Sequence, residues 1–129
     1  RTLHGSLGRR AAEWAEIVKI GRTHLMDAVP VTLGQECAAW ARQVELGIAR
    51  VEAALPGLLP LPQGGTAAGT GLNRHPEFPA FFAERMAALT GLPFTASDNP
   101  FEGMGAHDAF VEMSGALNTL AVSLNKIAN

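Results

Sequence analysis

One threonine–histidine pair has the residue types and the setting of a site for acid–base chemistry. Thr23 and His24 follow Arg22 in a stretch without helical periodicity, and Asp27 lies shortly after them. An imidazole, with a reference pKa near about 6.5, can donate or accept a proton at neutral pH, and a threonine hydroxyl can donate a hydrogen bond to an anionic substrate. Loops held by rigid helices often carry catalytic side chains. We therefore take Thr23 and His24 as the candidate site residues.

The other histidines have simpler interpretations. His4 lies near the start of the chain, and His75 precedes Pro76 at a predicted helix start, where a solvated or capping side chain is expected. His107 stands beside Asp108 at the entry of the last predicted helix. Two roles fit that position: a structural one, in a turn whose polar groups are all hydrogen-bonded, and a functional one, with the histidine paired to the carboxylate. We favour the structural role.

The sequence lacks the spacing of several catalytic and metal-binding motifs. It contains no Ser-x-x-Lys, no nucleophile elbow and no metal-spaced histidine pair. The glycine-rich run 64–73 has no P-loop lysine, so we interpret it as tight backbone routing, with substrate contact through Thr70 or Asn73 as the alternative. The single cysteine, Cys37, excludes an internal disulfide and is interpreted as a small buried apolar residue.

Composition restricts the possible partners. Of the 129 residues 17% are charged, below the roughly 25% of typical soluble domains, which indicates that part of the surface contacts protein. A net charge of -2 with scattered Lys and Arg argues against nucleic acid. The longest uncharged helical stretch, 113–125, is shorter than the roughly 20 residues that span a bilayer, so we expect no membrane contact. The single cysteine fits a reducing compartment and no N-terminal basic-plus-apolar signal is visible, so we expect a cytoplasmic protein. Because the sequence starts at Arg1 and ends within a helical pattern at Asn129, we expect a segment of a longer protein.

The periodicity of apolar residues predicts an all-α fold. Three- and four-residue steps predict helices over 2–19, 33–55, 76–90 and 105–129. Between them we expect a loop over 20–33, a connector over 56–73 and an extended segment over 92–102. The second helix begins with the capping-box spacing Thr32-x-x-Gln35, is stopped by Pro56, and is expected to bury Trp40, Val44, Ile48, Val51 and Leu55. The third helix should end at Gly91. We find no alternating strand run of useful length.

The last predicted helix is apolar on nearly every face. A helix of this kind belongs inside a helix bundle. The three short helices that precede it cannot cover it, so its neighbours must come from sequence outside this chain or from other subunits. Oligomerisation is therefore expected.

Several strings in register resemble class II fumarate hydratase. They are KIGRTHLMDAVPVTLGQE at 19–36, GGTAAGTGLN at 64–73, LTGLPF at 89–94, Phe101-Glu102, His107-Asp108-Ala109 and KIAN at 126–129. The resemblance covers nearly the whole chain, and several long strings are more specific than one short motif.

The resemblance implies a member of the fumarase/aspartase superfamily. Such a protein is a homotetramer built around a long central helix bundle, without metal or cofactor, that reversibly hydrates fumarate to (S)-malate in the tricarboxylic acid cycle. By the same match, Thr23 would bind a carboxylate of the small dicarboxylate substrate and His24 would act in proton transfer at the hydroxyl side.

The resemblance also implies that residues 1–129 are part of a lyase domain whose N- and C-terminal parts are absent. The family's upstream Ser-Ser-Asn string and its downstream G-S-S-x-M-P-x-K-x-N loop, with the serine thought to be the base, do not occur in this sequence. Active sites of the family are assembled from more than one subunit. The isolated chain is therefore expected to be catalytically inactive.

Two alternatives stay open. Aspartate ammonia-lyase resembles the same loop but commonly carries glutamine where His24 stands, and argininosuccinate and adenylosuccinate lyases match less closely. A non-catalytic helical assembly module, a protein of another class, would keep the packing helices but would have no need of an exposed Thr-His pair. His24 favours the fumarate hydratase over both.

Overall fold

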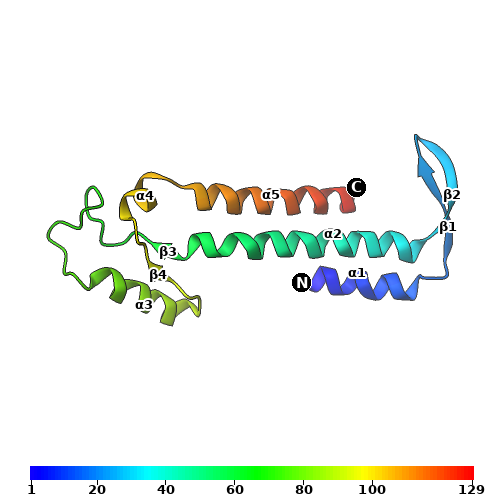
Figure 1. The fold of residues 1–129 in the computed structure, drawn as a ribbon. Helices are drawn as coiled ribbons and strands as arrows, with labels where there is room; N and C mark the ends of the chain where they lie inside the picture. Colours follow the sequence, from blue (N-terminus) through cyan, green and yellow to red (C-terminus); the bar gives the residue numbers. More distant parts are fainter. The chain divides into compact units, whose positions relative to one another are not determined.

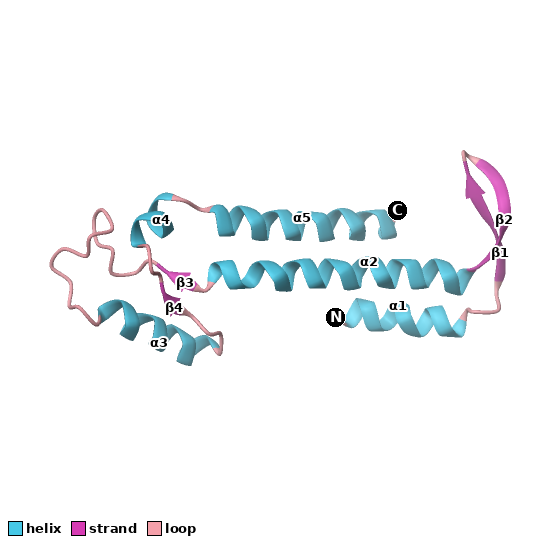
Figure 2. Ribbon diagram, viewed as in Figure 1, coloured by secondary structure: helices cyan, strands magenta, loops and turns pink.

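Helices contain most of the residues in the computed structural model, which describes the whole chain, 1–129 (Figures 1 and 2). The elements are α1 (Thr2–Glu13), β1 (Val18–Thr23), β2 (Met26–Thr32), α2 (Leu33–Ala54), the 3-10 turn η1 (Leu55–Leu58), β3 (Pro60–Leu61), α3 (Phe78–Thr90), β4 (Thr95–Ala96), α4 (Pro100–Gly105) and α5 (Asp108–Ala128). They form two compact units, one of residues 1–50 and 116–129 and the other of residues 51–115. The predicted helical class is confirmed, but the strands correct the all-α prediction.

The start of α2 in the first unit is held by the predicted capping box. The Thr32 N–H donates to Gln35 Oε1 at 2.9 Å, and the Gln35 N–H donates to Thr32 Oγ1 at 3.1 Å. The next two amides, of Leu33 and Gly34, donate to the carbonyl oxygens of Ile17 and Trp14 at 2.9 and 3.0 Å. These four amides lie at the N-terminal end of α2, where a helix offers its N–H groups no partner. The bonds from Leu33 and Gly34 therefore tie the chain just after the hairpin to the chain just before it.

The predicted helix over 2–19 is too long, because α1 ends at Glu13. The carbonyls of Trp14 and Ile17 bond to the start of α2 and not to a continuing helix. From Val18 onward the β-branched residues belong to a strand. Tertiary pairing thus overrides the helical period over these residues.

The stretch 20–33, predicted as a loop, is mostly an antiparallel hairpin of β1 and β2 (Figure 1). Val18 pairs with Thr32, Ile20 with Pro30, and Thr23 with Met26, with an irregularity between Ile20 and Arg22. The proline is compatible with β2 because a two-stranded ribbon consists of edge strands, where one backbone N–H can be lost. This pairing is the main correction to the fold prediction.

The second unit is organised around a short parallel pair. The Thr95 N–H donates to the Leu59 carbonyl at 3.1 Å and the Ser97 N–H to the Leu61 carbonyl at 2.9 Å, which joins β4 to β3. The helix α3 ends at Gly91, which has the left-handed φ of 72°, as predicted. The predicted extended segment 92–102 is only partly extended, because Asn99 accepts the Glu102 N–H and starts α4.

The buried core consists of small residues. Cys37 is 1% exposed and Val44 is 4% exposed, in agreement with their predicted burial, and the other core residues are Ala41, Ala54 and Ala83. Trp40, Ile48 and Val51 are only half-buried and Leu55 is exposed, so four of the five burial predictions for the second helix fail in this chain. No residue of α5 is buried. Within the first unit, α5 approaches α2 where Leu120 lies over Gly47.

Many large apolar side chains are exposed on the surface of this chain. That surface measures 9104 Å², against roughly 6,600 Å² for a folded monomer of this mass. Large apolar side chains such as Phe110, Val111 and Val122 are more than half exposed. No helix combines the length and hydropathy that a membrane crossing requires.

We expect the 129-residue chain on its own to be a loose helical species. Its core lacks large side chains, so burial of apolar area cannot offset the conformational entropy lost on folding. Far-ultraviolet circular dichroism should show helix, while thermal unfolding should be broad and a hydrophobic dye should bind. Sharp, cooperative unfolding of a monomer would contradict this expectation.

Candidate functional site

The hairpin tip carries both predicted site residues. Thr23 is the last residue of β1, and His24 and Leu25 form the two-residue turn that leads into β2. The side chains of Thr23 and His24 are exposed, and Leu25 is 92% exposed. The structure therefore places the pair at the end of a β-hairpin that follows α1 and precedes α2, and not in an irregular loop (Figure 2).

The backbone of this turn is strained. His24 has a φ of 51° and Leu25 a φ of 61°, so both lie in the left-handed region, as in a type I′ turn. Such turns usually contain Asn or Gly, because a side chain with a Cβ costs roughly 1–2 kcal/mol there. Strained backbone of this kind is concentrated at functional sites. The turn geometry is therefore consistent with a functional role for His24.

An ion pair closes the turn. Arg22 Nη2 lies 3.0 Å from Asp27 Oδ1, and both side chains are exposed. Neither residue was predicted from the sequence to have a role. The signal was present, because opposite charges five positions apart face each other across a two-residue hairpin turn.

A second ion pair holds the base of the hairpin. Lys19 Nζ lies 2.7 Å from Glu36 Oε2, and this pair joins β1 to the first turn of α2. Both side chains are a little over one third exposed. The base of the hairpin is thus attached to a rigid helix, while the tip projects beyond it.

The site in this chain offers a proton-transfer group and a hydroxyl donor. His24 can exchange a proton with a substrate, and the Thr23 hydroxyl can donate a hydrogen bond to a carboxylate. Adding water across a double bond next to a carboxylate also requires a second acid–base group and donors for the negative charge that develops. The hairpin tip presents no second acid–base group besides Asp27, whose carboxylate is paired with Arg22.

The remaining histidines have structural surroundings. His75 is exposed, in agreement with the solvated alternative, and its Nδ1 accepts the Glu77 N–H at 3.3 Å just before α3, whose N-cap residue is Glu77. The His107 ring contacts Phe110 edge-on with the centroids 6.1 Å apart, and the His107 carbonyl accepts the N–H groups of Phe110 and Val111 in the first turn of α5. His4 is half-buried in α1. No three His, Cys, Asp or Glu side chains converge as metal ligands would.

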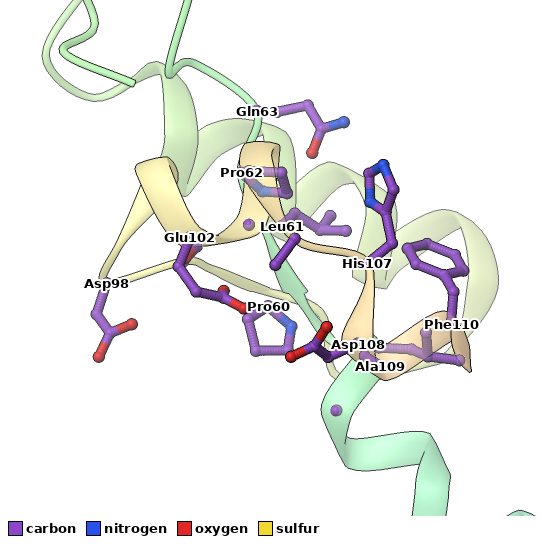
Figure 3. Close-up of a pocket in the computed structure, with 15 residues that line it drawn as sticks. Pro60, Leu61, Pro62, Gln63, Asp98, Glu102, His107, Asp108, Ala109 and Phe110 are labelled. Carbon is purple, nitrogen blue, oxygen red and sulfur yellow. The ribbon is translucent and has the colours of Figure 1, made fainter. Parts of the chain in front are cut away.

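The second unit contains a cavity of about 330 Å³ beside His107. In Figure 3, His107 and Phe110 lie together on one side of it, and Asp98 and Glu102 lie on the other. Asp108 also lines it, but no Lys or Arg does. Carboxylates would repel a dicarboxylate ligand, so this cavity is a poor candidate for the substrate site.

The glycine-rich run 64–73 follows a path that only glycine permits at several points. Gly69 has a φ of 107°, and a Cβ there would lie 2.7 Å from the Phe101 ring. A Cβ on Gly65 would collide with the Met104 sulfur. This geometry supports the predicted routing role. Thr70 and Asn73 are exposed, and their contact with a substrate stays an untested alternative.

The chain matches known proteins over its whole length. A family model described as lyase covers residues 1–129. The chain is 60% identical over 127 residues to the class II fumarate hydratase of Methylorubrum extorquens, which covers 98% of this chain and 27% of that protein. It is 54% identical over 129 residues to the mitochondrial fumarate hydratase of Danio rerio, covering 100% of this chain and 25% of that protein.

A solved structure agrees with these relatives. The class II fumarase of Schistosoma mansoni superimposes with a TM-score of 0.86 at 32% identity, over 98% of this chain and 30% of that one. The chain thus spans about a quarter of the length of the curated relatives it matches.

Proposed function

This chain belongs to the lyase family whose model it matches from residue 1 to residue 129, and on that basis we propose that it is part of a class II fumarate hydratase. The protein would catalyse the reversible hydration of fumarate to (S)-malate, a step of the tricarboxylic acid cycle. The observation that carries the proposal is the 60% identity to a fumarate hydratase, in a chain that presents Thr23 and His24 at a strained hairpin tip.

We assign His24 to proton transfer at the hydroxyl-bearing carbon. In the hydration direction, its neutral imidazole accepts a proton from water as the oxygen bonds to one alkene carbon. In the reverse direction, its imidazolium protonates the departing hydroxide, which is otherwise a poor leaving group. The Thr23 hydroxyl donates to a substrate carboxylate and holds the alkene in place.

Three further requirements follow from the same chemistry. The other alkene carbon must gain or lose a proton, the enolate-like dianion must be stabilised, and water must be excluded from the intermediate. We assign these tasks to groups outside this chain, which spans about a quarter of its curated relatives. We accordingly propose that the isolated 129 residues are inactive.

The exposed apolar surface supports an assembled protein. With no residue of α5 buried, the helix requires neighbours that this chain does not supply. We propose that α2 and α5 contribute to a long central helix bundle of a homotetramer, located in the cytoplasm. The size of the complete protein in solution, measured by light scattering, tests the tetramer.

Proton NMR of fumarate incubated with the complete protein separates the proposal from its rivals. We expect malate to form at the same rate with and without ammonium in the buffer, because His24 replaces the glutamine that aspartate ammonia-lyases commonly carry. Aspartate that forms only with ammonium would identify the ammonia-lyase instead. Absence of any product would favour the non-catalytic assembly module.

A further inference from the structure

The Arg22–Asp27 ion pair occupies a distinctive place in the hairpin. The two residues are register partners one step below the Thr23–Met26 pair, and their side chains join the strands at 3.0 Å. Between the irregularity after Ile20 and the turn, this is the one side-chain hydrogen bond that joins the strands. The pair therefore borders the turn that carries His24.

The turn needs such support because its own residues do not favour its conformation. His24 and Leu25 both have positive φ, and both carry a side chain that crowds the backbone there. The base of the hairpin cannot supply this support, because the Lys19–Glu36 pair and the capping box lie at the end of the hairpin opposite to the turn. A contact across the strands next to the turn opposes relaxation of the turn directly.

We propose that Arg22 and Asp27 act as a pair of positioning residues that hold the turn, and with it His24 and Thr23, in the geometry that proton transfer requires. The inference rests on the proposed function for its catalytic consequence. An exposed ion pair contributes little to global stability, so its effect should be on geometry and not on unfolding. A catalytic group must be held to within about 0.5 Å, and a misplacement of about 1 Å can cost on the order of a hundredfold in rate.

The main competing explanation is that Arg22 itself binds the dicarboxylate. Its guanidinium is exposed close to the tip, and guanidinium groups bind carboxylates well. The two explanations make different predictions for an exchange of the two charges. If the pair acts as a unit, Arg22→Asp combined with Asp27→Arg restores the contact, whereas direct substrate binding by Arg22 is lost in that variant.

The experiment uses the complete protein and compares kcat and KM for fumarate. We expect Arg22→Gln and Asp27→Asn each to lower kcat about tenfold and to raise KM by no more than about threefold, equally in both variants, because misplacing His24 slows proton transfer and misplacing Thr23 weakens one carboxylate contact. The charge-exchanged double variant should recover to within about threefold of the parent kcat. Circular dichroism and oligomer size should match the parent in every variant.

A matched control comes from another exposed ion pair of the first unit. Arg42 lies 2.6 Å from Glu45 on α2, with side-chain exposures of 64% and 51%. The charged atoms of this pair lie closer together than those of the Arg22–Asp27 pair, and the hydrogen bond from Arg42 holds the pKa of Glu45 below its ordinary value. Arg42→Gln should leave kcat and KM within about twofold of the parent, since surface ion pairs away from a site have small effects.

Hydrogen exchange supplies a measurement that does not depend on activity. Peptides that cover residues 18–32 should exchange several-fold faster in the two single variants than in the parent, and the double variant should return to the parent rate. Parent-like exchange and kcat in the single variants would overturn the proposal. So would a large rise in KM confined to Arg22→Gln and kept in the double variant. If the parent does not hydrate fumarate, the proposed function fails, and exchange alone decides whether the pair holds the turn.

Discussion

The substitution His24→Asn should lower kcat of the complete protein by at least about a hundredfold while the assembly stays intact. General acid–base catalysis by a positioned histidine contributes roughly 10²–10⁴-fold, and asparagine has no group that titrates near neutral pH. Asparagine also tolerates the left-handed φ of 51° at this position better than most residues. The turn should therefore keep its shape, and the loss can be assigned to proton transfer.

Steady-state kinetics with fumarate and with malate, together with oligomer size, measure this effect. The matched control is His75→Asn, because His75 is exposed and contacts Glu77, whose N–H it accepts, a role that an asparagine side chain can reproduce. Turnover of the His24 variant within about twofold of the parent would mean that its assigned role is wrong.

The substitution Gly34→Ala should destabilise the complete protein by about 2–3 kcal/mol. A Cβ at Gly34 would lie 2.8 Å from Ala15 Cα and would also collide with the Ala11 carbonyl oxygen. Backbone atoms of this kind cannot move aside without separating the start of α2 from the end of α1. The same junction carries the base of the hairpin, so kcat should also fall.

The opposite sign is expected for Gly8→Ala in α1. A Cβ built there meets no atom within 4 Å apart from its chain neighbours and the nearby backbone of α1, and alanine in a helix interior is favoured over glycine by roughly 0.5–1 kcal/mol. Urea midpoints of the two variants and the parent compare the effects. Equal stability of the Gly34 variant and the parent would show that the close approach of α1 and α2 is not rigid.

Local signals in the sequence predicted several helix ends correctly. The capping box at Thr32 and Gln35 forms as predicted, and Gly91 ends α3 in the left-handed conformation. These features depend on backbone groups or side chains within a few residues of one another. A pattern of neighbouring residues is therefore sufficient to predict them.

The hairpin was missed for a physical reason. Its turn is formed by His24 and Leu25, which lack the Asn-Gly signature of such turns, and Pro30 argues against a strand. A hairpin with such a turn depends on contacts outside the turn itself. The Arg22–Asp27 pair, proposed above to hold the turn, lies beside it, and the carbonyls of Ile17 and Trp14 separately tie the base of the hairpin to the start of α2.

The sequence was sufficient to choose the candidate residues, but not to predict where they lie in the fold. The identities and order of Thr23 and His24 supported the proton-transfer hypothesis, and the resemblance to class II fumarate hydratases supplied the substrate. Their place at a strained hairpin tip, bordered by an ion pair, became visible only in three dimensions.

By itself, the sequence determined the helical class, the capped start of α2, the end of α3 and the pair of residues proposed to carry the chemistry. Only the tertiary structure decided that α1 stops at Glu13, that residues 18–32 form a hairpin, and that the turn holds His24 in a left-handed conformation. The difference has a physical basis. Helix ends are set by hydrogen bonds within a few residues, whereas strand pairing and a strained turn depend on contacts between segments that the sequence does not place side by side.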